Sequence, residues 1–312
     1  MDFVAEHLQT FKTVIEAGSM ERAAQQLNVT PSAVSQRLKS LEKQAGSVLF
    51  IRSRPIRTTA GGDVLLRLAR EIQMISTEAH RSLGLEPAID EAPRRIDLSI
   101  AVNADSLASW FAPVIEGLAA QEMMSCEILR HDEAHSTELL RSGQVMGAVS
   151  TKSTPVQGCS AVYLGTMRYR AMASRVFRDR WLPGIDSREE LAAAPMVNFD
   201  RTDDLQGALR RRVTGTGVSV TPVQHFVPDS RAFVAAVSAS LGWGMVPDVQ
   251  APVDGSLVVL DPSWSSEVKL FWQRWKVPSQ ALDLLTALVM DAAGKAGLRG
   301  SETGANVWTT DR

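Results

Sequence analysis

Residues 18–46 contain the pattern that most restricts how this chain can fold. Gly18 and Ser19 mark the end of one helix and the start of the next, because glycine accepts the left-handed backbone of a helix end and a serine hydroxyl caps free N–H groups. Thr30 and Pro31 give a second helix start, since proline loses nothing at the first helical position. Apolar residues recur at helical spacing between these signals. The segment therefore predicts two short helices joined by a tight turn, a helix-turn-helix.

Two short strands and a long amphipathic helix are expected after this motif. Residues 48–51 and 56–58 are apolar segments around an arginine-rich turn, which makes the unit a winged helix-turn-helix. Apolar residues then recur along one side from Ala60 to Leu83, and a helix of this length commonly pairs with its copy in a dimer. Residues 84–93 hold two prolines, one glycine and three acids, which is typical of a linker.

The charge of the chain is distributed unevenly. The formal net charge is −2, yet residues 22–57 contain seven lysines and arginines and one glutamate. Such a local basic patch predicts a polyanion partner for this end of the molecule, and small hydrogen-bonding side chains at the start of the second helix suit close approach to the major groove of double-stranded DNA. The side chains expected to contact bases or phosphates are Thr30, Pro31, Ser32, Ala33, Ser35, Gln36, Arg37, Lys39, Arg52, Arg54 and Arg57.

Strands and helices alternate beyond the linker. Residues 96–102 alternate as a strand, one helix running from Leu107 to Leu118 follows, and strands at 126–129 and 145–149 flank a further helix. This βαβαβ order implies an α/β fold with a parallel sheet, and a second such unit is traced from Arg168 onward.

The chain of 312 residues is long enough for two or three domains. The expected organisation is a winged helix-turn-helix DNA-binding domain over 1–59, a linker helix and hinge over 60–93, an effector domain over 94–300 and a polar tail over 301–312. Within the effector domain, lobe 1 is expected to combine 94–165 with 268–300, and lobe 2 to cover 166–267.

The residues from Gly18 to Ala24 and from Leu27 to Glu42 resemble the signature of the LysR-type transcriptional regulators. Order and spacing agree as far as Thr59-Ala60-Gly61-Gly62, where the family more often has Glu-Ala after the threonine, so the extra glycine is expected to loosen the first helical turn. The resemblance implies a winged domain, a linker helix and a two-lobed, periplasmic-binding-protein-like effector domain. It also implies a homodimer or homotetramer that binds operator DNA and acts on RNA polymerase at the promoter.

A narrower resemblance extends over both expected lobes. The segments that carry it are Ile100–Leu107, Asp132–His135, Gly147–Val149, Leu164–Arg168, Gly242–Gly244 and Trp272–Trp275, and they resemble the LysG/ArgP subgroup of the family. That likeness implies a sensor of L-lysine or L-arginine that controls, and activates, a gene for a basic amino-acid exporter.

A basic amino acid carries one carboxylate and two cationic groups. We expect the side chains that bind these groups at the carboxyl ends of the predicted strands, where open α/β sheets bind ligands. Asp105, Asp132, Glu133 and Asp200 are expected to bind the cationic groups, because carboxylates form charge-assisted hydrogen bonds with them. Hydroxyl side chains are expected to bind the α-carboxylate of the amino acid, and Trp243 is expected to cover its aliphatic stem. The full set of expected effector residues is Asn103, Ala104, Asp105, Ser106, Asp132, Glu133, Ser150, Thr151, Thr166, Asn198, Asp200, Asp203 and Trp243.

Other functions fit the sequence less well. Another effector, such as an aromatic or organic acid, is the alternative within the family, and the acidic candidate residues argue against it. A transport receptor would need a signal peptide, and charged residues interrupt the region where its apolar stretch would lie. No apolar run approaches the length of a transmembrane span, so we expect a cytoplasmic protein. A third alternative function is that of an architectural DNA-binding protein that responds to no effector.

No enzyme, cofactor or metal site is expected. The chain shows no catalytic nucleophile with its base and no phosphate-binding glycine loop. His131 and His135 lack the HExxH order of a metal site. Cys126 and Cys159 are expected to be buried, inert thiols.

Overall fold

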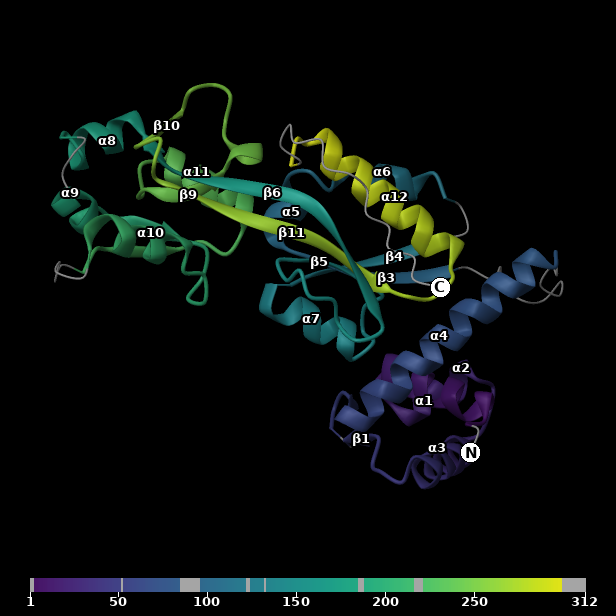
Figure 1. Cartoon of the computed structure of the whole chain (residues 1–312). Helices are drawn as coiled ribbons and strands as arrows, with labels where there is room; N and C mark the ends of the chain where they lie inside the picture. The colour runs from purple at the N-terminus through teal and green to yellow at the C-terminus, as the bar shows by residue number, and fades with distance from the viewer. Residues whose placement is uncertain are drawn as a thin grey trace. The chain divides into compact units, whose positions relative to one another are not determined.

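The chain divides into two compact units in the computed structural model (Figure 1). Unit 1 comprises Met1–Val102, Gly117–Val162 and Trp272–Ala287, and unit 2 comprises Asn103–Glu116, Tyr163–Phe271 and Leu288–Arg312. The residues that the structure describes are 3–51, 53–84, 96–121, 124–131, 133–184, 188–215 and 221–298. Most of the predicted linker at 84–93 and the whole predicted tail at 301–312 lie outside them. No described helix combines the length and the apolar character needed to cross a membrane.

The N-terminal part of unit 1 is the predicted helix-turn-helix. Its helices are α1 (Ala5–Ala17), α2 (Met20–Gln26) and α3 (Pro31–Ala45). The Ser19 hydroxyl accepts a hydrogen bond from the Arg22 amide at 3.1 Å and Thr30 accepts one from the Ala33 amide at 3.2 Å, which confirms both predicted caps. One face of each helix contributes to a shared apolar core that includes Leu8, Phe11, Ala23, Val34 and Leu38.

The predicted wing is present but its strands are shorter than expected. They are β1 (Phe50–Ile51) and β2 (Arg57–Thr58), and they pair antiparallel. Expected strand residues Val48 and Leu49 instead bind other partners: the Leu49 amide donates to Glu42 Oε1 at 3.0 Å, and the Val48 carbonyl accepts from the Thr59 hydroxyl at 2.7 Å. The wing is thereby attached to the residue that precedes the linker helix.

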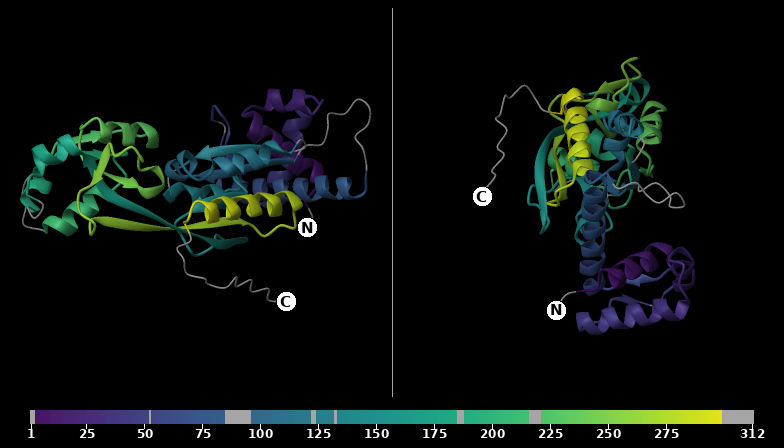
Figure 2. Two further views of the ribbon diagram at one scale, coloured as in Figure 1. Left: turned by 90° about the horizontal axis from the view of Figure 1, so that it is seen from above. Right: turned by 90° about the vertical axis from the view of Figure 1, so that its right-hand side faces the viewer.

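The linker helix α4 (Ala60–Ser82) extends from this bundle (Figure 2). Its first turn is capped by Thr59, whose hydroxyl accepts from the Gly62 amide at 3.1 Å. A Cβ atom added at Gly62 would lie 1.9 Å from the Leu49 carbonyl oxygen, so only glycine fits here. Gly62 thus allows close packing between the helix and the wing, whereas the looser first turn expected from the extra glycine at position 61 stays a prediction.

The rest of unit 1 contains the predicted parallel sheet. Strand β3 (Ile96–Val102) lies between β4 (Met124–Arg130) and β5 (Gly147–Ser150), and both pairings are parallel. Helix α7 (Glu133–Arg141) joins β4 to β5, and helix α12 (Gln280–Lys295) begins in this unit.

The single helix expected from Leu107 to Leu118 was wrong. The structure has two helices, α5 (Ala104–Ala108) and α6 (Ala112–Ala119). Pro113 explains the break, because its ring would clash with the carbonyl group of the residue four positions earlier and it has no N–H to donate.

Unit 2 is built around the long strand β6 (Cys159–Ser174), which was expected to span only 168–173. Strands β9 (Gly244–Pro247) and β10 (Leu257–Val259) pair antiparallel with β6, so the parallel sheet expected for this unit was wrong there. Strand periodicity shows which residues share a face and says nothing about strand direction. Both β6 and β11 (Ser265–Trp275) contain residues of the two units.

The remaining elements of unit 2 surround a small apolar core that includes Met172, Val197, Phe233, Val237 and Val246. Strands β7 (Met196–Asn198) and β8 (Gln224–Phe226) pair in parallel beside it. The helices are α8 (Arg175–Trp181), α9 (Arg188–Ala193), α10 (Leu205–Thr214), α11 (Ser230–Ser238) and the 3-10 turn η1 (Asp248–Gln250).

Candidate DNA-binding surface and effector site

Helix α3 presents a polar surface opposite its buried apolar stripe. Val34, Leu38 and Leu41 are buried in the core of the domain and fix the rotation of the helix. The predicted base-contacting side chains therefore lie on the outer face, with Pro31, Ser32, Gln36 and Lys39 exposed and Ala33 and Ser35 partly exposed. Small side chains on an exposed first turn let a helix approach the base edges of a major groove.

Two of the predicted DNA-contacting residues have partners within the domain. The Thr30 hydroxyl accepts from the Ala33 amide as the cap of α3. The Arg37 guanidinium forms an ion pair with Glu6 and donates to the Thr10 hydroxyl at 3.3 Å, so it links α3 to α1. A phosphate contact by Arg37 stays a prediction, and it requires the Glu6 pair to be shared or released.

The wing adds positive charge to this surface. Arg54 and Arg57 are exposed, whereas Arg52 lies outside the described residues. Lys39, Arg54 and Arg57 form no salt bridge with any described residue. Unpaired cations beside an exposed recognition helix are suited to phosphate groups.

One predicted effector residue of unit 2, Asp105, accepts hydrogen bonds from three other segments of the unit. Its Oδ2 atom accepts a hydrogen bond from the Tyr169 hydroxyl at 2.8 Å, and its Oδ1 atom accepts one from the Ser230 hydroxyl at 2.7 Å. The Gln250 amide donates to the Asp105 backbone carbonyl at 3.0 Å. Four elements, α5, β6, α11 and η1, therefore meet at this residue. Tyr169, Ser230 and Gln250 were not predicted, because nothing local in the sequence associates them with position 105.

Asp203 places a second carboxyl group near Asp105. Burial raises the pKa of Asp203, and the negative charges of Asp105 and Asp200 raise it further, while backbone N–H groups from Leu205 and Phe199 oppose the shift. The charge of Asp105 acts on Asp203, so the two carboxyl groups lie within electrostatic range in unit 2. A cation placed between them would relieve this repulsion.

Asp200 has a local role in the structure. Its Oδ1 atom accepts from the Thr202 amide at 2.6 Å, the Thr202 hydroxyl at 2.6 Å and the Asp203 amide at 2.9 Å. These hydrogen bonds to the charged form, with that of the Thr202 hydroxyl the largest contributor, lower the pKa of Asp200. Asp200 thus orders the turn that carries Asp203.

Ser106 and Trp243 are fully buried in unit 2. The Asn103 side chain accepts from the Ser106 amide at 3.0 Å and caps α5, with Ala104 partly exposed beside it. The Ser106 Oγ and the Trp243 Nε1 atoms find no hydrogen-bond partner among the described residues. Trp243 has no exposed surface, so its ring belongs to the interior of the unit and does not form a surface lid in this structure.

The other predicted effector residues are divided between the two units. In unit 2 the Thr166 hydroxyl bonds to that of Tyr163 at 2.6 Å, and the Asn198 amide donates to Gln224 Oε1 at 3.3 Å. In unit 1 the buried Ser150 hydroxyl accepts from the Lys152 amide at 3.1 Å, and Thr151 is partly exposed. Asp132 and the side chain of Glu133 lie outside the described part of the structure.

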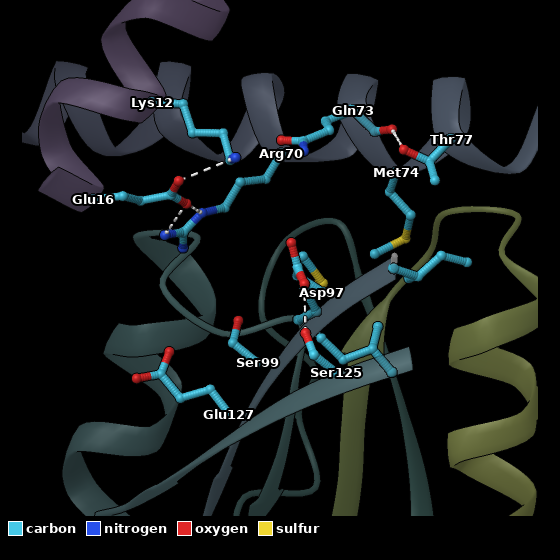
Figure 3. Close-up of a pocket in the computed structure, with 13 residues that line it drawn as sticks. Lys12, Glu16, Arg70, Gln73, Met74, Thr77, Asp97, Ser99, Ser125 and Glu127 are labelled. Carbon is cyan, nitrogen blue, oxygen red and sulfur yellow. Dashed lines mark hydrogen bonds and ion pairs between the residues drawn. The ribbon is translucent and has the colours of Figure 1, made fainter. Parts of the chain in front are cut away.

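A separate cavity of about 480 Å³ lies within unit 1 (Figure 3). Helices α1 and α4 line one side, and strands β3 and β4 contribute side chains to the other. Glu16, in α1, lies here between Lys12 and Arg70. None of the predicted effector residues is among the described residues that line this cavity.

The two thiols have environments that suppress reactivity. Burial raises the pKa of Cys126 to about 11, with a smaller contribution from the negative charge of Glu127. Burial also raises the pKa of Cys159, against the opposing influence of Arg67. Because the thiolate is the reactive species, neither environment favours redox chemistry near neutral pH.

Two family descriptions match the chain. "Bacterial regulatory helix-turn-helix protein, lysR family" matches residues 5–63, which contain α1, α2, α3 and the wing. "LysR substrate binding domain" matches residues 92–294.

Several regulators are similar to the chain over nearly its full length. The transcriptional regulator LysG of Mycobacterium tuberculosis is 42% identical over 290 residues, covering 92% of each chain. The lysine export transcriptional regulatory protein LysG of Corynebacterium glutamicum is 38% identical, covering 92% of this chain and 96% of that protein.

Solved structures of such regulators are similar as well. Full-length LysG from Corynebacterium glutamicum with bound effector Arg has a TM-score of 0.77 and 36% identity, covering 94% of this chain and 98% of that one. ArgP from Mycobacterium tuberculosis has a TM-score of 0.82 and 41% identity, covering 92% and 96%.

Proposed function

The chain belongs to the LysR family of bacterial transcriptional regulators, and from that premise we propose that it senses L-lysine or L-arginine and activates a gene for basic amino-acid export. Like these relatives, it is a DNA-binding transcriptional regulator and not an enzyme. The names of those relatives, lysine export regulator and LysG with bound effector Arg, support the effector class and the controlled gene.

The observation that carries the effector proposal is the pair of carboxyl groups on Asp105 and Asp203. Two acids held within electrostatic range, one of them buried enough for its pKa to be raised, disfavour an anionic ligand and favour a cationic one. The unpartnered Ser106 hydroxyl is a polar atom that a ligand could satisfy. An aromatic or organic acid would bring a third negative charge to this place, which makes it the weaker candidate.

The proposed response is a shift between conformations. Strands β6 and β11 contain residues of both units and connect them covalently. A ligand that binds one arrangement of the units more tightly than another increases the population of that arrangement. The change in the sensor then alters the arrangement in which the paired DNA-binding domains bind their operator. That arrangement in turn affects how RNA polymerase binds at the promoter.

The decisive test combines calorimetry with a DNA-binding assay. DNA is first selected by the protein from a random-sequence library, and titrations with L-lysine, L-arginine, L-histidine and an aromatic acid follow. We expect heat of binding and a changed DNA affinity with L-lysine or L-arginine, and neither with the aromatic acid. A response to the aromatic acid alone would replace the proposed effector class.

Helix α4 carries an apolar stripe suited to a second copy of the chain. Val64, Ile72 and Ile75 are exposed at 65%, 40% and 46%, and Leu83 continues the same side just beyond the helix. Large apolar side chains repeating on one side of a long helix gain stability by packing against a matching helix. We therefore assign dimerisation to this stripe.

Charging this stripe should dissociate the dimer. In Ile72→Lys/Ile75→Lys, two cations per chain would face their copies, and we expect the dimer dissociation constant to rise about 100-fold or more, ~2.7 kcal/mol. Sedimentation velocity over a dilution series measures the change. Ile115→Lys, at an exposed apolar position of α6, is the matched control and should leave the dimer intact. An unchanged dimer in the double variant would contradict the assignment.

A further inference from the structure

Helix α4 contacts different parts of unit 1 through different faces. Successive residues of an α-helix turn by about 100°, so residues 67, 70 and 78 share one side while 65, 66 and 69 share another. Leu65, Leu66 and Ala69 are buried in the apolar core of the helix-turn-helix domain. The helix and the DNA-binding domain therefore share one continuous core.

The other side of α4 contacts the sensor part of unit 1 through polar groups. Arg67 Nη1 donates to the Gln157 carbonyl at 2.8 Å, and Nη2 donates to the Gly158 carbonyl at 2.9 Å. Its guanidinium lies 5.3 Å from the ring centre of Trp275, and its Nε donates to Glu71 at 2.9 Å. All five N–H donors of an arginine form a fixed planar fork, so this set of partners fixes the position of the side chain.

Two glycines make this close approach possible. Gly143 and Gly158 have φ angles of +75° and +74°, in the left-handed region that other residues rarely adopt. A Cβ atom at Gly143 would lie 2.7 Å from the Cβ of Arg67, and one at Gly158 would lie 2.6 Å from its Nη2. The loops of the sensor are thus shaped to receive Arg67.

Arg70 joins three elements one turn further along α4. Its guanidinium donates to the Gly143 carbonyl through Nη1. It also donates to Glu16 of α1, at 3.1 Å through Nη2 and at 3.3 Å through Nε (Figure 3). Lys12 also pairs with Glu16, at 3.1 Å. Arg70 therefore connects the DNA-binding domain directly to a loop of the sensor.

Glu78 provides a contact at the far end of the helix. Its Oε1 atom accepts from the Ser279 hydroxyl at 2.6 Å and from the Ala281 amide at 3.3 Å, at the start of the 16-residue helix α12. A carboxylate at this end of a helix is favoured by the helix dipole and satisfies a free N–H group. The contact between α4 and the sensor is thus polar at both ends.

We propose that Arg67, Arg70 and Glu78 form a releasable clasp that holds the DNA-binding domain and linker helix against the sensor part of unit 1. The polar composition supports release, because ion pairs and hydrogen bonds exchange with water at little net cost, whereas the shared apolar core of α4 and the DNA-binding domain does not. Between these polar groups Met74 of α4 is buried, and the cavity of about 480 Å³ beside Arg70 interrupts the packing there (Figure 3). In the regulatory part of the proposal, which rests on the proposed function, the effector acts on DNA binding through this clasp.

The first test measures the geometry and needs no effector. In the full chain with Cys126→Ala and Cys159→Ala, spin labels are attached at Gln25→Cys in α2 and Ala287→Cys in α12, both exposed positions of unit 1. Arg67→Met/Arg70→Met keeps the side-chain stems and removes both guanidinium groups. We expect the distance distribution between the labels to become about twofold broader or to gain a second population. Arg175→Met, an exposed arginine of α8, is the matched control and should leave the distribution unchanged.

The second test measures the coupling between the two ligands. The ratio of DNA affinities with and without L-arginine should fall toward one in the Arg67→Met/Arg70→Met variant, while calorimetry gives the same L-arginine affinity as in the unmodified chain. An unchanged distance distribution would overturn the clasp. A broadened distribution with an unchanged ratio would overturn its role in signalling. If the unmodified chain shows no L-arginine response, the proposed function fails, and the distance measurement alone decides the clasp.

Discussion

Replacing Ser35 with glutamate is expected to weaken operator binding by about 100-fold or more, ~2.7 kcal/mol. Ser35 lies on the outer, partly exposed face of α3, on the helix whose buried side is fixed by Val34 and Leu38. A carboxylate at this position would face phosphates or base-edge acceptors and would displace contacts worth about 1–3 kcal/mol each. Fluorescence anisotropy with library-selected DNA at one fixed salt concentration measures the loss.

The control for Ser35→Glu places the same charge on the same chain, away from α3. Ser153→Glu, at an exposed position of the sensor part of unit 1, should change the affinity less than about twofold, because charges separated by more than a Debye length are largely screened. Circular dichroism and the melting temperature show whether each variant is folded. A folded Ser35→Glu protein with unchanged affinity would remove α3 from the DNA interface.

The second large effect is expected at the effector site. Asp105→Asn should weaken L-arginine binding by about 30-fold or more, because removing one partner of a buried charged pair costs about 2–5 kcal/mol. The amide keeps the shape of the side chain and a carbonyl acceptor for the Tyr169 or Ser230 hydroxyl, so unit 2 should stay folded. Isothermal titration calorimetry measures the effector affinity, and the affinity for DNA without effector should be unchanged.

The Tyr169→Phe variant distinguishes the contribution of the Asp105 charge to effector binding from the contribution of the hydrogen bonds that Asp105 accepts. This variant removes one donor to the carboxylate and leaves the carboxylate charged, so L-arginine binding should change by no more than about threefold. If Asp105→Asn binds L-arginine normally, the cation site lies elsewhere. If Tyr169→Phe loses as much affinity for L-arginine as Asp105→Asn does, binding depends on the fixed position of the Asp105 side chain and not on its charge.

Helix boundaries were predictable because their signals are local. Ser19 and Thr30 cap the helices as their side chains suggested, and the long linker helix ends within a residue of its expected boundary. Each of these features depends on hydrogen bonds over three or four residues, which the sequence displays directly.

The partners of Asp105 could not be predicted in the same way. Tyr169, Ser230 and Gln250 are separated from it by 64, 125 and 145 positions, so only the completed fold brings them together. The composition of a single segment also cannot show that Arg37 is paired with Glu6, because both residues remain compatible with an exposed position. The sequence indicated acidic residues at the expected strand ends but could not indicate the hydrogen bonds that they form.

The attachment of the wing to α4 makes the linker helix a mechanical lever. At 1.5 Å per residue, its 23 residues extend about 34 Å. Thr59 and Gly62 fasten one end to the wing at Val48 and Leu49, while Glu78 engages α12 near the other. A tilt of about 10° around Glu78, which lies about 27 Å from the start of the helix, would displace the wing end by roughly 5 Å, more than the 3.4 Å rise of one base pair. Under the proposed response, a small change in the angle of α4 would therefore shift the wing by more than the spacing of one base pair.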